Sequence, residues 1–222
     1  MQIIINYFKT LQPKQVKKFL IIFYGVGVIG FSNPYTHAWF IHLTPIALLM
    51  NMFLLLRFHS SEFSSTILKL FIGIFIFSFV IEMIGVQSGA IFGNYKYGNG
   101  LGIKLFDTPL LIGINWLMVS YCFRIIAETL LKNKIIIIIA SALGMTIYDV
   151  IIEQVAPYLD MWTWAENIIP FQNYVAWFIL ALIIQISIYF SRVSLKNPIA
   201  IVLTTTQLSF FVLIYLYLLF IS

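Results

Sequence analysis

The chain has 222 residues, of which 61% are hydrophobic and only 9% are charged, and its formal net charge is +5. About a quarter of the residues in a typical soluble domain are charged, so this composition excludes an ordinary soluble domain and indicates an integral membrane protein. A basic excess in a membrane protein usually reports topology, so it implies neither a nucleic acid nor an acidic substrate. At roughly 20 residues per span, we expect residues 1–222 to form a single transmembrane domain.

The hydrophobic runs predict about seven spans and therefore an all-α, polytopic transmembrane helix bundle. Their expected bounds are about 16–32, 37–58, 66–86, 108–127, 135–156, 173–191 and 198–220. Proline is tolerated at helix ends or stops a helix, and it falls beside the proposed bounds at Pro34, Pro109, Pro157, Pro170 and Pro198. Residues 1–12 are expected to form either a short interfacial helix or a disordered tail.

The basic residues orient this bundle. Seven spans place on one side of the membrane Lys9, Lys14, Lys17, Lys18, Arg57, Lys69, Arg124, Lys132, Lys134, Arg192 and Lys196. Only Lys96 and Lys104 fall on the other side. Because basic loops stay in the cytoplasm, we expect a cytoplasmic N-terminus, an external C-terminus and a multi-pass protein of the bacterial inner membrane.

Acidic residues lie inside the apolar runs. Asp149 and Glu153 are four apart, so on a helix their side chains share one face. Asp149 lies roughly 20 Å into a core about 30 Å thick, and Glu82 lies at a similar depth in the third span. Carboxylates at bilayer depth are costly and usually functional. The alternative is that they only pair with Lys104 or cap polar helix contacts.

The segment that follows Glu82 is rich in glycine up to Gly102, with Phe92, Tyr95 and Tyr97 between the glycines. Glycine supplies backbone conformations with positive φ, so this composition predicts a tight folded loop. The interleaved aromatic residues favour a structured wall over a plain linker. An ordinary interfacial loop with an aromatic belt is the alternative.

Three blocks within about 82–178 resemble the integral-membrane carotenoid biosynthesis proteins. The first block contains Glu82, Gly85, Gly89, Phe92, Gly93, Tyr95, Tyr97, Gly102, Lys104, Pro109 and Trp116. The second contains Met145, Thr146, Tyr148, Asp149 and Glu153, and the third contains Pro170, Asn173 and Trp177. The chain departs from the family pattern at Gln87, Tyr148 and Glu153, where His, Trp and Asp are usual. The characterised members are carotenoid 1,2-hydratases, including the bisanhydrobacterioruberin hydratases.

The resemblance implies a hydro-lyase that adds water to the C1–C2 double bond of an acyclic carotenoid ψ-end. This reaction needs a proton donor, a pocket that tolerates a tertiary carbocation, and one water molecule. An apolar site favours a neutral carboxyl group, neighbouring carboxyls can share a proton, and aromatic faces stabilise cations. The candidate catalytic residues are Asp149, Glu153 and Glu82. The candidate substrate-binding residues are Tyr95, Tyr97, Trp116, Tyr148, Asn115, Asn173 and Trp177, with Asn115 or Asn173 holding the water.

Within this set we expect Asp149 to be the general acid and Glu153 to tune it. Glu153 lies one turn nearer the outer surface, where contact with water would keep it charged. Neither a cofactor nor a metal is expected, because His37, His42 and His59 form no cluster and no Asp-x-x-Asp pattern is present.

Two other functions remain open. A carotenoid cyclase or isomerase would use the same acid but lose a proton instead of capturing water. A proton-coupled transporter would also carry carboxylates in the membrane, although such proteins usually show repeated halves. The expected partners are a lycopene-like or γ-carotene-like substrate, the lipid bilayer and other carotenoid enzymes, and no nucleic acid.

Overall fold

The computed structural model describes residues 11–221. Most of the predicted N-terminal helix or tail (residues 1–12) lies outside the described residues, and so does Lys9. Residues 11–221 contain seven α-helices that are long and apolar enough to cross a membrane. They are α2 (Pro13–Ser32), α3 (His37–Arg57), α4 (Ser65–Ser88), α5 (Leu111–Leu130), α6 (Lys134–Glu153), α7 (Phe171–Ser191) and α8 (Ala200–Ile221). The predicted all-α transmembrane bundle is confirmed, and each predicted span corresponds to one helix.

Local signals explain several helix ends. The side chains of Ser64 and Asn133 accept hydrogen bonds from backbone N–H groups in the first turns of α4 and α6, which is the usual role of these residue types at an N-cap. Gly89 ends α4 with a φ of 64°, a conformation that glycine adopts without steric cost. Helix α6 ends at Glu153, earlier than the predicted residue 156, because the chain turns before Pro157.

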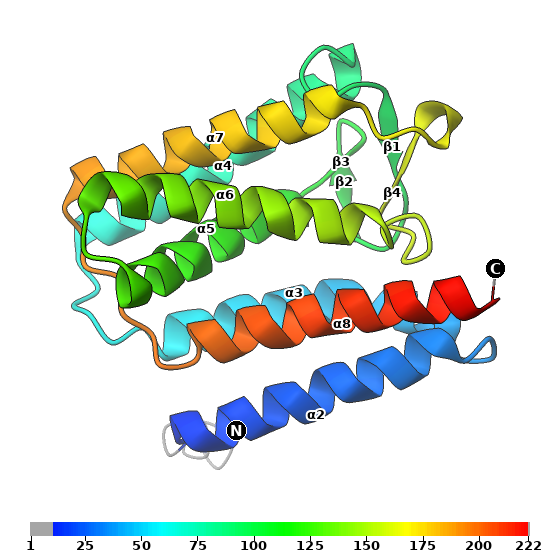
Figure 1. Cartoon of the computed structure of the whole chain (residues 1–222), viewed down its shortest axis with the longest axis horizontal. Coiled ribbons are helices and arrows are strands. Elements are labelled where there is room, and N and C mark those ends of the chain that lie inside the picture. The colour runs from blue at the N-terminus through cyan, green and yellow to red at the C-terminus, as the bar shows by residue number, and fades with distance from the viewer. Residues whose placement is uncertain (1–10, 222) are drawn as a thin grey trace.

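The helices form two groups (Figure 1). Helices α4, α5, α6 and α7 pack in sequence-adjacent pairs, while α2 packs along α8 and against α3. Contacts of α5 with α3 and α8 join the two groups. Four short strands lie together at one end of the bundle, where α4, α6 and α8 all end (Figure 1). The loops rich in basic residues lie at the other end.

The strands bring together two connections that are far apart in sequence. Strand β1 (Tyr95–Tyr97) precedes α5, and β4 (Trp162–Trp164) precedes α7. They pair antiparallel, with Tyr95 opposite Trp164 and Tyr97 opposite Trp162. The predicted tight loop after α4 therefore contains a strand whose partner lies beyond α6. Two further strands, β2 (Lys104–Leu105) and β3 (Thr108–Pro109), form a small hairpin before α5.

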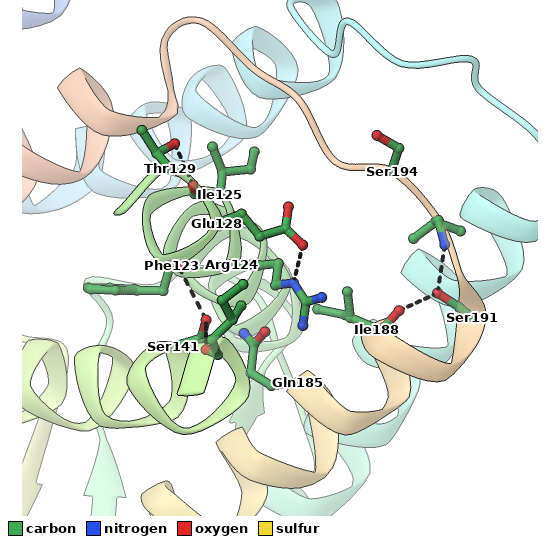
Figure 2. Close-up of polar contacts among 12 residues, drawn as sticks. Phe123, Arg124, Ile125, Glu128, Thr129, Ser141, Gln185, Ile188, Ser191 and Ser194 are labelled. Atoms are coloured by element: carbon green, nitrogen blue, oxygen red, sulfur yellow. Dashed lines mark hydrogen bonds and ion pairs between the residues drawn. The ribbon is translucent and has the colours of Figure 1, made fainter. Parts of the chain in front are cut away.

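Polar side chains also connect the helices away from the strands. Arg124 Nε donates to Glu128 Oε1 on the same helix at 2.6 Å, and Ser141 Oγ on α6 donates to the Phe123 carbonyl on α5 at 3.4 Å (Figure 2). Gln185 Nε2 on α7 donates to the Ser120 carbonyl at 3.0 Å. The bonds of Ser141 and Gln185 fix α5 against α6 and α7, and α5 in turn carries Trp116 into the site described next.

A buried cluster of carboxylates

Glu82 lies buried near the end of α4, beneath β1. Its Oε2 accepts hydrogen bonds from the hydroxyls of Tyr95 at 2.6 Å and Tyr97 at 2.8 Å. Its Oε1 accepts a third hydrogen bond from Trp116 Nε1 on α5 at 2.8 Å. Three segments of the chain therefore converge on this one carboxylate. The alternative that Glu82 pairs with Lys104 is not observed, since Lys104 Nζ donates to the Tyr97 carbonyl.

The alternation of a β-strand explains why two tyrosines reach the same carboxylate. Residues two apart on a strand point to the same face, so Tyr95 and Tyr97 face inward while Lys96 is exposed. Burial, followed by the negative charge of Glu82, raises the pKa of both phenols well above their usual value. Both hydroxyls therefore keep their protons and can act as donors.

Asp149 and Glu153 lie on one face of α6, as their spacing predicts, and Asn173 at the start of α7 joins them. Asn173 Nδ2 donates to Asp149 Oδ2 and to Glu153 Oε1, each at 3.1 Å. Glu153 Oε2 also accepts hydrogen bonds from Trp162 Nε1 at 2.9 Å and Trp164 Nε1 at 2.7 Å. Glu153 is only 4% exposed, so it does not meet water at the outer surface as expected: the two indoles of β4 cover it.

A small cavity lies between the two glutamates. Its volume is about 20 Å³, which is enough for one water molecule. Carboxylates and aromatic rings dominate its wall, which consists of Glu82, Phe92, Tyr95, Tyr97, Ile112, Glu153, Trp162, Trp164, Asn173 and Trp177. Asp149 does not line the cavity and lies one layer deeper, behind Asn173. The cavity can hold water but is too small for an alkene end group.

The structure brings together most of the residues predicted for the site. Trp116 and Trp177 stack with ring centroids 3.9 Å apart, and Trp177 reaches the cavity. Two predicted residues lie elsewhere. Tyr148 packs its ring against Phe123 and Phe211. Asn115 is half-buried and is not part of the cavity wall.

Sequence reasoning missed the roles of Trp162, Trp164 and Phe92. The pattern Trp-Thr-Trp repeats the alternation of Tyr-Lys-Tyr in β1, and this match was the available signal that two strands pair. What the sequence did not indicate was the carboxylate that the indoles contact. Among residues 11–221, no group of three or more His, Cys, Asp or Glu side chains is arranged to hold a metal ion.

Residues 11–221 contain seven helices that are long and apolar enough to span a membrane, and a buried acidic site lies among α4, α5, α6 and α7; together they indicate a multi-pass membrane protein. The chain belongs to the carotenoid biosynthesis protein family, whose model matches residues 40–222. The whole carboxylate cluster lies inside this matched region, so the protein has a role in carotenoid biosynthesis. No curated protein and no solved structure matches the chain in the corresponding comparisons.

Proposed function

We propose that the chain is a carotenoid hydratase that adds water to the C1–C2 double bond of an acyclic carotenoid ψ-end. The observation that carries this proposal is the water-sized cavity between Glu82 and Glu153, enclosed by aromatic rings. Hydration needs a proton, a stabilised cation and one water molecule, and this arrangement offers a group for each requirement.

In the proposed reaction a carboxylic acid gives its proton to C2, which leaves a tertiary carbocation at C1. The rings that surround the cavity and the remaining carboxylate charge stabilise this cation electrostatically. The oxygen of the water molecule then bonds to C1, and the proton that it loses returns to the carboxylate that gave its proton to C2. The product is a tertiary alcohol and the protein ends in its starting state, so neither a redox partner nor a cofactor is consumed.

Hydrogen-bond partners support Asp149 as the proton donor. Glu82 and Glu153 each accept three hydrogen bonds, and donors directed at both oxygens favour a carboxylate anion. Asp149 accepts a single hydrogen bond, from Asn173. In this arrangement Glu82 and Glu153 hold the water and stabilise the cation, while Asp149 supplies the proton. Access of the alkene to Asp149 requires Asn173 or strand β4 to move.

Expression in a lycopene-producing bacterial host tests the proposal. The pigment should gain the mass of one or two water molecules, and growth in water labelled with oxygen-18 should place the label in the product. An Asp149→Asn chain produced at the same level is the control for host enzymes. A pigment of unchanged mass that contains a new ring would favour the cyclase, and an unaltered pigment would contradict both reactions.

A further inference from the structure

A second cavity lies in the other helix group, away from the carboxylates. Its volume is about 220 Å³, larger than an apolar cavity of about 150 Å³ that accommodates benzene. Helices α2, α3 and α8 and the connection between α6 and β4 form its wall. Most of the wall is aromatic or aliphatic, with Phe23, Phe31, Phe40, Leu48, Phe210 and Phe211 among its members. Such a cavity accommodates an apolar molecule.

One polar atom in this wall, on Asn51, has no hydrogen-bond partner. Asn51 is fully buried, and its Nδ2 donates to the Tyr24 hydroxyl at 2.6 Å. The other end of the amide, Oδ1, is buried without any hydrogen-bond partner. Buried polar atoms are nearly always paired because an unpaired one is costly. A hydroxyl group both donates and accepts, so it can serve whichever end of this amide faces the cavity.

The position of the cavity indicates how a ligand enters. Val26 on α2 and Leu43 on α3 line it and are 52% and 48% exposed on the lipid-facing surface. Its inner wall includes Leu159 and Met161, and Met161 directly precedes Trp162 of the carboxylate site. An apolar molecule can therefore enter from the bilayer, between α2 and α3, and come to rest against the segment that leads into β4.

We propose that this cavity binds the hydroxyl-bearing end of an acyclic isoprenoid molecule, with the hydroxyl bonded to Asn51. A branched isoprenoid is the favoured occupant because the chain has a role in carotenoid biosynthesis and the wall offers broad aromatic faces. The whole of the α2 wall lies before residue 40, outside the region that the family model matches. The proposal rests on that family role but not on the reaction that the carboxylates perform.

Photolabelling of the full-length purified protein tests the site directly. The probe is a tertiary C15 isoprenoid alcohol that carries a diazirine, and mass spectrometry locates the labelled peptides. Label should concentrate in peptides that contain residues 23–31, 43–51 and 207–211. Unlabelled alcohol should compete about 3- to 10-fold better than the matching hydrocarbon, the effect expected of one hydrogen bond.

Two variants separate the cavity from the lipid surface. Ala47→Phe adds a ring inside the cavity and should reduce labelling at least about tenfold, whereas Ile46→Phe, on the lipid-facing side of α3 at 62% exposure, should leave it unchanged. Asn51→Leu should retain labelling but abolish the preference for the alcohol. Folding of each variant is checked by thermal stability.

Three results would overturn the proposal: label spread evenly over lipid-facing helices, equal competition by the hydrocarbon, or equal competition by a linear fatty alcohol. The last result would identify a general lipid pocket. Because the readout is binding, these outcomes do not depend on hydratase activity. Failure of the hydration assay with normal labelling would contradict the proposed reaction alone.

Discussion

At the scale of single residues, the three carboxylates differ in the hydrogen-bond donors that surround them. Glu82 is held by two phenols and an indole, and Glu153 by two indoles and an amide. Asp149 has only the amide that it shares with Glu153. Replacing a carboxylate by its amide keeps the size of the side chain but removes the exchangeable proton and the charge. The variants Glu82→Gln, Asp149→Asn and Glu153→Gln therefore distinguish the roles of the three carboxylates.

Asp149→Asn should abolish hydration at an unchanged protein level, because general acid catalysis contributes about 10²–10⁴-fold. Glu153→Gln should lower the rate by a smaller factor, because its contribution to the cation and the water is partial. Pigment composition by mass spectrometry, normalised to protein, gives both values. If the Asp149→Asn variant kept near-normal hydration activity while the Glu82→Gln variant had none, the proton donor would be Glu82 on α4.

Trp162→Phe and Trp164→Phe each remove one indole donor from Glu153 and leave a ring in place. A lost hydrogen bond to a buried charged group costs about 1–3 kcal/mol, so each variant should unfold more readily in detergent. The double variant should lose more than either single variant, and thermal unfolding measures the difference. The matched control is Trp39→Phe, whose ring is 73% exposed and whose replacement should change stability little.

At the scale of elements, the pairing of β1 with β4 closes the site, and glycine permits the close approach of the chain that follows β1. A Cβ atom on Gly98 would lie 2.3 Å from the Asp160 carbonyl oxygen, and one on Gly100 would lie 2.4 Å from that of Leu159. Neither distance is sterically possible. Backbone bonds from Gly98 to Met161 and from Gly100 to Asp160 hold this approach in place.

Gly98→Ala and Gly100→Ala should therefore displace β1 and weaken the bonds from Tyr97 to Glu82. Overpacking of this kind costs about 1–3 kcal/mol, and we expect lower thermal stability together with lower hydratase activity. Gly25→Ala and Gly73→Ala are the controls, because a Cβ atom at either position meets nothing within 4 Å. Equal behaviour of all four variants would show that the close approach does not matter.

The sequence predicts features that depend on nearby residues, and it does not predict contacts between residues that are far apart along the chain. The spans follow from runs of apolar residues, and the shared face of Asp149 and Glu153 follows from a spacing of four, so both are local. The cover over Glu153 is not local, because Trp164 is opposite Tyr95 only after two separate connections meet. For the same reason Tyr148, which has a suitable side chain and lies next to Asp149, proved to face Phe211 instead.

At the scale of the whole molecule, the described basic side chains and the carboxylate cluster lie toward opposite ends of the bundle, apart from Lys96 and Lys104 beside the strands. This separation predicts that the cluster lies toward the non-cytoplasmic side, since basic loops remain in the cytoplasm. The prediction concerns orientation in the membrane, which the arrangement of helices alone leaves open.

Single cysteines at Ser88 or Thr163, both exposed near the strands, test the orientation in a Cys122→Ser background. They should react with a membrane-impermeant thiol reagent in intact cells. A cysteine at Lys132, exposed in the connection between α5 and α6, should react only after lysis. The opposite labelling pattern would reverse the topology and the side on which the cluster lies.

The order in which the chain is synthesised adds a constraint on how the cluster forms. Glu82 precedes its donors Tyr95, Tyr97 and Trp116 in the chain, and Asp149 and Glu153 precede Trp162, Trp164 and Asn173. Each carboxylate therefore gains its partners only when a later segment arrives. A chain that stops before α7 contains the donors to Glu82 and both indoles that bind Glu153 but lacks Asn173, so Asp149 gains its hydrogen-bond partner only when α7 is added.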